Sequence, residues 1–173
     1  MNSQTAHIFV WLSRIHHCRG FGIQSPTDYA FVRYVINEHW PYYAYEQLTD
    51  DDWLTQKLGR LYFRLANWRQ PKVMLADRWQ RYWQAGCRTM TIAHTIGTVE
   101  LACIDIDDQQ AWQSVLQAVD DRSVVVVEGI NRNPRRWQQL KSHCRVTISF
   151  DLYYCAILMF DSKRQPQHYI INF

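Results

Sequence analysis

The run Ser123-Val124-Val125-Val126-Val127 constrains the fold more than any other segment of this 173-residue chain. β-Branched side chains favour extended backbone, and a continuous apolar run lacks the alternation of a strand that has one face in water. The pattern is typical of a strand that is buried on both faces. We therefore predict that this segment forms the centre of a sheet.

Short β-rich runs alternate with helical patterns from Pro71 onward, which predicts parallel strands joined by crossover helices. The expected strands are 73–75, 89–93, 99–104 and 123–127, with helices beginning near Trp79, Gln109 and Asn133. Three further strand-like runs close the chain without a helix between them: 145–152, 154–160 and 168–173. Because hairpin-like turns would join these last strands, we expect them to be antiparallel. The predicted fold class is α/β, with parallel core strands and antiparallel C-terminal strands.

Residues 1–69 show helical patterns only, and we expect them to cap the α/β core of residues 70–173 within one domain. The first helix, 5–17, has an apolar stripe of Ile8, Trp11, Leu12 and Ile15. A second helix starts at Ser25-Pro26, with a buried stripe of Tyr29, Val32, Val35 and Ile36. A third ends near Asn67, with Leu54, Leu58, Leu61, Tyr62 and Leu65 on its inner face. The aromatic connector between the last two helices, residues 39–45, is either a packing lid or a contact surface.

Composition argues against nucleic-acid-binding, disulfide-bonded and membrane-spanning classes of protein. The formal net charge of +3 is too small to imply a nucleic-acid partner by itself. The basic and aromatic string Arg78–Trp83 could stack bases as single-strand binders do, but half of it has the period of a helix packed on a sheet, so nucleic-acid contact is the weaker interpretation. Five cysteines without a CxxC pair indicate reduced thiols in a cytoplasmic protein. No signal peptide or membrane-spanning run is expected.

Several strings resemble one family. They are Gln24-Ser25-Pro26 with Tyr29, Pro41–Glu46, Lys57–Asn67, Gln70-Pro71-Lys72, Arg145–Leu152 and His168–Phe173. Together with the order of elements, they resemble class I S-adenosylmethionine-dependent methyltransferases of the small O-methyltransferase-like kind found in Bacteroidetes. The resemblance implies a reduced Rossmann-like sheet. None of these strings binds the cofactor in the family, so they support the fold more than an activity.

The loop after the first core strand departs from the family. There the resemblance implies an acid followed by glycines, because only residues without a Cβ let the backbone approach the ligand. In this chain Asp77 could replace the acid, but Trp79 and Arg81 stand in the glycine region and no glycine occurs until Gly86. We therefore expect the approach to the cofactor to be blocked.

Two further departures point the same way. An acid that would accept hydrogen bonds from both ribose hydroxyls is replaced by His94, and a neutral imidazole accepts only one such bond. The family also has a helix, a strand and a second helix where this chain has only residues 95–98. Asp77, Trp79, His94 and Asp105 are thus degenerate counterparts of cofactor-binding positions. We expect no catalytic residue and no bound S-adenosylmethionine.

Acidic residues gather at the predicted strand ends: Asp105, Asp107, Asp108 and Glu128. In related O-methyltransferases such carboxylates hold a divalent metal, which makes Asp105 and Glu128 the weak metal candidates here. The other interpretation is that these acids cap the helices that start near Gln109 and Asn133. That interpretation is the one we favour, and no metal is expected.

Two hypotheses on function remain. The first is a catalytically silent methyltransferase-like scaffold that binds a protein partner or a second copy of itself, through the connector around Trp40–Tyr45. The alternative is a divergent enzyme that still binds S-adenosylmethionine in an altered pocket and methylates a small acceptor.

Overall fold

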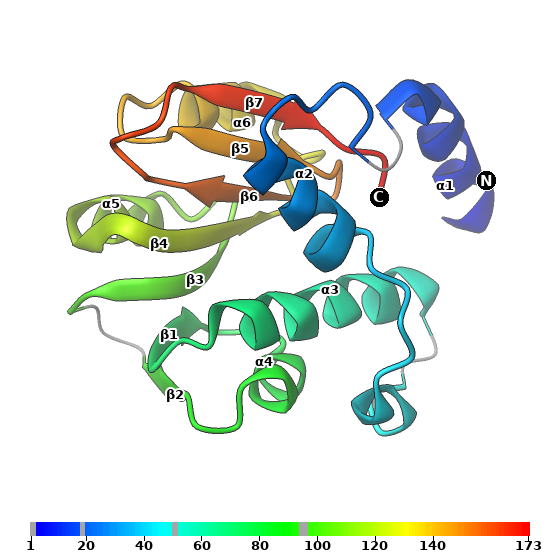
Figure 1. The fold of residues 1–173 in the computed structure, drawn as a ribbon. Helices are drawn as coiled ribbons and strands as arrows, with labels where there is room; N and C mark the ends of the chain where they lie inside the picture. Colours follow the sequence, from blue (N-terminus) through cyan, green and yellow to red (C-terminus); the bar gives the residue numbers. More distant parts are fainter. Residues whose placement is uncertain (1–2, 18–19, 50–51, 94–96) are drawn as a thin grey trace.

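A computed structural model describes residues 3–17, 20–49, 52–93 and 97–173. Within them, a seven-stranded sheet has the order β2-β1-β3-β4-β6-β5-β7 (Figure 1). The strands are β1 (Val73–Ala76), β2 (Thr91–Ala93), β3 (Val99–Asp105), β4 (Val119–Glu128), β5 (Ile148–Asp151), β6 (Cys155–Met159) and β7 (Gln167–Ile170). The α-helices are α1 (Ser3–Ser13), α2 (Pro26–Phe31), α3 (Trp53–Arg69), α4 (Gln80–Gly86), α5 (Gln109–Ala118) and α6 (Pro134–Lys141). Shorter helical turns are η1 (Ile15–His17), η2 (Val32–Ile36) and η3 (Tyr43–Glu46).

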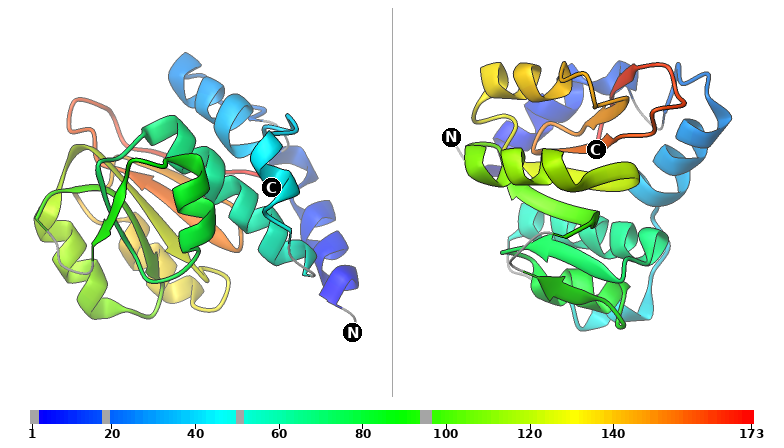
Figure 2. Two further views of the ribbon diagram at one scale, coloured as in Figure 1. Left: turned by 90° about the horizontal axis from the view of Figure 1, so that it is seen from below. Right: turned by 90° about the vertical axis from the view of Figure 1, so that its left-hand side faces the viewer.

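Strand β4 confirms the central prediction, since it is the fourth of the seven strands. Val124 and Val126 pack into the core beneath α3 and α4, whereas Val125 and Val127 pack into a second core beneath α5 and α6. All four side chains are buried. The sheet therefore lies between two helical layers (Figure 2), as a strand without polar alternation requires.

The strand directions match the prediction except at the end of the chain. β1 pairs in parallel with β2 and β3, and β3 with β4, while β6 is antiparallel to both β4 and β5. The expectation that all three closing strands are antiparallel is wrong for β7, which pairs in parallel with β5. Both edges of β6 are already occupied, and β7 begins beside the start of β5, where β6 also ends. The chain therefore passes β5 and adds to its free edge in the same direction.

Local signals place the helix starts correctly. The Ser25 hydroxyl accepts the Asp28 N–H at 3.3 Å, and Pro26 opens α2. Asn133 caps α6 in the same way, with the Arg136 N–H at 3.1 Å from its Oδ1. Such caps depend on a few neighbouring residues, which is why sequence alone locates them.

The apolar stripe of α1 is not buried, contrary to the prediction. Ile8 is 58% exposed and Leu12 is 50% exposed. The helix lies at the periphery, beside the C-terminal end of the chain (Figure 1). Polar contacts hold this segment: the Asn172 amide donates to the Trp11 carbonyl at 3.1 Å, and Arg14 pairs with Asp151 at 2.7 Å. The periodicity identified the apolar face correctly, but no sufficient packing surface lies opposite it.

The prediction that Tyr29 belongs to the buried stripe of the second helix is also wrong. It is 44% exposed, whereas Val32, Val35 and Ile36 are buried as expected. Phe31 takes the inner position instead, because α2 continues into the wider π-helical turn η2 and the inward face shifts along the sequence. Among the helices described, none combines the length and the apolar character needed to cross a bilayer.

Candidate functional site

The carboxyl ends of β1, β3 and β4 lie next to one another. Asp77 follows β1, Asp105 ends β3, and Glu128 ends β4 as the register partner of Asp105. The chain passes from β1 to β2 on one side and then to β3 on the other, which makes the gap between β1 and β3 a topological switch point. Open α/β sheets bind their ligands at such a point, outside the strand ends.

A cavity of about 290 Å³ occupies this position, and we call it the strand-end cavity. Its lining includes Asp77, Arg78, Cys103, Asp105 and Glu128. The structure therefore brings together four acids singled out from the sequence, since Asp108 also lines this cavity. His94, another candidate at a strand end, lies outside the described residues.

Trp79 lies over the end of β4. Its backbone has a positive φ of 66°, and its indole N–H donates to Glu128 Oε1 at 2.7 Å. The Tyr62 hydroxyl, from α3, donates to the same oxygen at 2.9 Å, and the rings of Tyr62 and Trp79 meet edge to face. Glu128 is only 8% exposed. This carboxylate therefore joins α3, the start of α4 and β4 in a buried hydrogen-bonded cluster, which we call the Glu128 cluster.

Burial suppresses acid–base and nucleophilic chemistry around the Glu128 cluster. It raises the pKa of the Tyr62 phenol well above its ordinary value. Burial, with the nearby Glu128 carboxylate, likewise raises the pKa of the Cys103 thiol, and burial does the same for the pKa of Cys155. Thiols with raised pKa values stay protonated at neutral pH and are poor nucleophiles and poor metal ligands.

The two metal candidates have separate protein partners. Arg132 pairs with Asp105 Oδ2 at 2.5 Å, and the other oxygen of Asp105 accepts the Asp107 N–H at 3.0 Å. Glu128 is engaged by Tyr62 and Trp79, as described above. Within the part of the chain that the structure describes, no group of three or more His, Cys, Asp or Glu side chains could hold a metal ion.

The favoured interpretation, that the acids at the strand ends cap the helices, is confirmed for Asp108 alone. Asp108 caps α5 by accepting the Ala111 N–H at 2.8 Å. Asp107 does not cap a helix itself, but it accepts from the amide of Asn133, the capping residue of α6, at 2.9 Å. These side chains therefore fix the strand-to-helix turns.

The basic and aromatic string 78–83 offers little stacking surface. Tyr82 is 1% exposed and Trp83 is fully buried, where it stacks on Tyr62. Gly59 on α3 makes room for this packing, because a Cβ there would lie 2.3 Å from the Tyr82 ring. The helical packing that the periodicity predicted accounts for these two aromatic residues.

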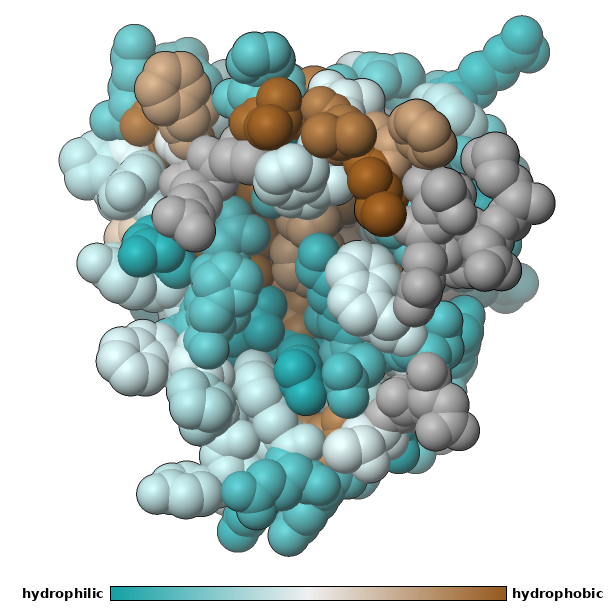
Figure 3. All heavy atoms as spheres, turned by 90° about the vertical axis from the view of Figure 1, so that its right-hand side faces the viewer, coloured by the Kyte–Doolittle hydropathy of each residue, from teal (hydrophilic) through white to brown (hydrophobic). Residues whose placement is uncertain are grey.

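A larger cavity, of about 1,000 Å³, opens between α1, the connector, α3 and the end of the chain, and we call it the connector cavity. Figure 3 looks onto this side of the molecule, where hydrophobic side chains gather in the upper part and the surface is hollowed below them. Aromatic residues line much of the cavity: Trp11, Trp40, Tyr42, Tyr43, Tyr45, Trp53 and Phe173. The connector is thus part of a cavity wall, with Trp40 and Tyr43 exposed at 72% and 91%.

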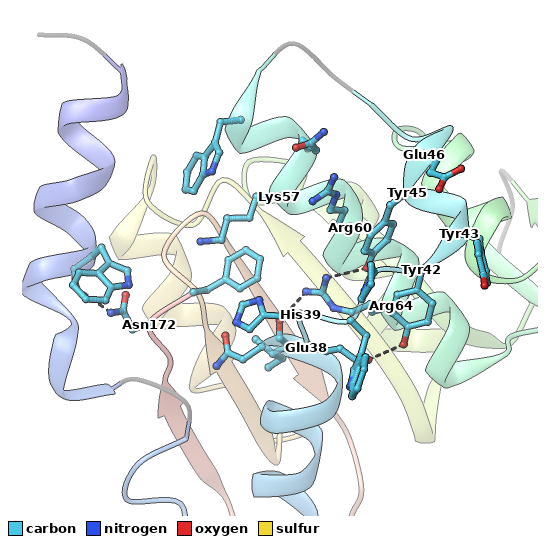
Figure 4. Close-up of a pocket in the computed structure, with 18 residues that line it drawn as sticks. Glu38, His39, Tyr42, Tyr43, Tyr45, Glu46, Lys57, Arg60, Arg64 and Asn172 are labelled. Atoms are coloured by element: carbon cyan, nitrogen blue, oxygen red, sulfur yellow. Dashed lines mark hydrogen bonds between the residues drawn. The ribbon is translucent and has the colours of Figure 1, made fainter.

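Three cations on one face of α3 enter this cavity: Lys57, Arg60 and Arg64 (Figure 4). Arg64 is structural, since it donates to the carbonyls of Val35 and Ile36 at 2.6 and 2.7 Å. The sequence analysis missed this cluster. Its signal was present, because the three residues recur at intervals of three and four residues, but charged helix positions are usually solvated.

Lys57 and Arg60 rest on aromatic rings. The Lys57 Nζ is 4.7 Å from the centre of the Trp53 ring and 4.6 Å from that of Phe173. The Arg60 guanidinium lies 4.8 Å from the centre of the Tyr45 ring. Burial lowers the pKa of Lys57 to about 8. The cavity therefore combines positive charge with flat apolar walls.

Comparison with known proteins yields no assignment: no family model, no curated protein and no solved structure matches the chain.

Proposed function

We propose that this protein is a catalytically silent relative of the class I methyltransferases, a reduced Rossmann-like scaffold that does not bind S-adenosylmethionine at its strand ends. The sheet order supports the proposal, because four parallel strands with a switch point between β1 and β3 precede one antiparallel strand, β6. A ligand of such a sheet belongs at the switch point. The residues present there decide whether it still fits.

The position of Trp79 carries the proposal. A positive φ of 66° is a conformation that glycine adopts without cost, and it lies in the turn where the resemblance expects glycines. The turn therefore keeps a glycine-type backbone while an indole occupies the space beside it. The indole is fixed by its hydrogen bond to Glu128 at 2.7 Å, so it cannot move aside without leaving a buried carboxylate short of a donor.

The remaining space also supports the proposal. The strand-end cavity, at about 290 Å³, is at the lower limit of ordinary ligand pockets, which span roughly 300–1,000 Å³. Asp105, which lines it, is already paired with Arg132. What remains is a small polar recess rather than a cleft for a cofactor with an adenosyl group.

The test is a titration of the protein with S-adenosylmethionine and with its demethylated product, by calorimetry and thermal unfolding. A ligand at one hundred times its dissociation constant adds about 2.7 kcal/mol of stability, or roughly 5–11 °C in a protein of this size. We expect no saturable heat and no shift in melting temperature. A saturable shift with either ligand contradicts the proposal.

The Trp79→Gly variant separates the indole from the other departures. Glycine suits the positive φ, so the turn is retained while the indole that contacts Glu128 is removed. Trp79→Ala is the matched control, because it removes the same indole but keeps a Cβ beside the backbone. If Trp79 is the main barrier, weak binding returns in the glycine variant and is weaker in the alanine variant.

A partner-binding role is assigned to the connector. Trp40 and Tyr43 are its most exposed aromatic residues, and rings of this kind often anchor interfaces. The partner is a protein or a second copy of this chain. Sedimentation of the wild-type protein and of a Trp40→Ser/Tyr43→Ser variant tests the second-copy arm: a concentration-dependent dimer that the variant loses supports it, and a monomer at all concentrations contradicts it.

A further inference from the structure

We propose that the connector cavity is a binding site for a small organic carboxylate that carries a flat aromatic body. The inference does not depend on the proposed loss of S-adenosylmethionine binding, because the residues that line the connector cavity and the strand-end cavity are different. It concerns a ligand that neither the scaffold role nor the cofactor requires.

Unpaired hydrogen-bond donors indicate the chemistry of the ligand. The Arg60 Nε and the Asn37 Nδ2 are buried, and neither has a hydrogen-bond partner within the described chain. Asn37 as a whole is 8% exposed and lines the cavity. Buried donors without acceptors are unfavourable, so an acceptor that enters the cavity recovers the missing hydrogen bonds.

Lys57 adds a charge that no carboxylate of the described residues neutralises. Its ammonium rests on the rings of Trp53 and Phe173, and no hydrogen bond or salt bridge to it occurs in the described residues. Burial and the nearby Arg64 charge lower its pKa to about 8, as expected for an ammonium group that no described carboxylate pairs with. An anion placed between Lys57 and Arg60 would offset it.

The two side-chain carboxylates that line the cavity, Glu38 and Glu46, do not fill this role. The Glu38 Oε2 accepts from the Tyr42 hydroxyl at 2.7 Å, on the connector side. Glu46 is exposed. Figure 4 shows Lys57 and Arg60 on the α3 side of the cavity and Glu46 at its far edge. A ligand carboxylate therefore has a basic, partly desolvated position of its own.

The walls indicate the rest of the ligand. Trp40, Tyr42, Tyr45, Trp53 and Phe173 supply ring faces and edges around the cations. The volume of about 1,000 Å³ accommodates a molecule with one or two fused rings. Aromatic walls favour a flat apolar body by stacking and burial, and the cationic end orients its carboxylate.

The experiment titrates the intact protein with 2-naphthoate, 2-naphthamide and inorganic phosphate, using calorimetry and the amide and indole signals in nuclear magnetic resonance. We expect 2-naphthoate to bind saturably, and at least tenfold more tightly than the uncharged amide or the ringless phosphate. Equal binding of the acid and the amide, or no saturation by 2-naphthoate at 10 mM, overturns the proposal.

Variants locate the site. Lys57→Met and Arg60→Met each remove one cation while keeping an apolar stem, and we expect each to weaken 2-naphthoate binding at least tenfold. Lys72→Met is the matched control, since Lys72 is exposed at the start of β1, and it should leave binding within twofold of wild type. If the control weakens binding as much as the cavity variants do, the ligand binds elsewhere and the assignment is wrong.

A folding defect is distinguishable from a lost contact. Lys57→Met removes a buried charge and should not lower the melting temperature, so weaker binding by this variant cannot be attributed to unfolding. If 2-naphthoate does not bind, the proposal that S-adenosylmethionine does not bind is unaffected. If S-adenosylmethionine does bind, the proposal of a carboxylate site is likewise unaffected. The carboxylate site and the loss of S-adenosylmethionine binding are therefore tested separately.

Discussion

Trp79→Phe tests the Glu128 cluster directly, because it keeps a ring but removes the indole N–H. The lost hydrogen bond is short, 2.7 Å, and ends on a carboxylate that is 8% exposed. Hydrogen bonds to buried charged groups contribute about 1.5–3 kcal/mol, and the smaller ring removes some packing as well. We expect the free energy of unfolding to fall by about 2–3 kcal/mol, which corresponds to roughly 4–12 °C in melting temperature.

Urea unfolding at pH 7 measures this change, and a double-mutant cycle with Glu128→Gln isolates its cause. The neutral amide oxygen still accepts from Tyr62, but it does not form a charge-assisted bond with Trp79. We expect Trp79→Phe to cost about 1 kcal/mol in the Glu128→Gln background, which leaves a coupling energy of at least about 1 kcal/mol between the two positions. Costs that agree within about 0.5 kcal/mol in the two backgrounds would refute this reasoning.

Three further perturbations follow from the packing and the charges. Gly59→Ala should lower stability by about 1–2 kcal/mol although alanine is the better helix former, because the new Cβ would lie 2.3 Å from the Tyr82 ring; a stabilised variant in thermal unfolding would contradict the packing. Asp28→Asn should cost about 3 kcal/mol in urea unfolding, since Asp28 is 2% exposed and holds Arg164 through two contacts of 2.7 Å; a loss under about 1 kcal/mol would contradict that. Lys57 has a folded pKa of about 8, below the 10.5 of the unfolded chain, so the unfolded state holds its proton longer and stability rises between these pH values. Relative to Lys57→Met, wild-type stability should increase from pH 8 to pH 9.5 by at most about 1.4 kcal/mol per pH unit, and a pH-independent difference would show that the lysine is not desolvated.

Parts of the fold that depend on neighbouring residues were predictable. The valine run 123–127 identified β4 because only a strand covered on both faces can be apolar at every position. Ser25 and Asn133 identified two helix starts because capping involves atoms within a single turn. Elements that depend on distant partners were not predictable in the same way.

Two errors show that limit. The apolar positions of α1 are periodic, but whether they are buried depends on a surface that other segments must supply, and Ile8 remains 58% exposed. The direction of β7 depends on which strand edge is free after β6 has paired on both sides. Hydropathy patterns carry no information on either question.

In the candidate sites, too, positions along the chain were predictable from the sequence, whereas contacts between distant segments were not. Sequence singled out Asp77, Asp105 and Glu128, because residues after parallel strands meet at one edge of the sheet. It singled out Trp79 because the resemblance expects glycines in that turn. It did not show that Trp79 donates to Glu128, since that bond joins segments far apart in the chain. Only part of the connector cavity was predictable. The aromatic residues of its connector wall were noted from the sequence, but Lys57 and Arg60 have the pattern of solvated helix positions. Only the structure shows that they line a cavity with residues of α1 and the end of the chain.

The indole N–H resonance of Trp79 tests the central claim most directly. In nitrogen-15 spectra of the protein, which has eight tryptophans, this signal is assigned by its absence from the Trp79→Phe variant. We predict that it exchanges slowly with solvent, as a buried hydrogen bond to Glu128 requires, and that saturating S-adenosylmethionine leaves its position unchanged. A resonance that exchanges freely in the unliganded protein, or that shifts saturably as the cofactor is added, would contradict the account.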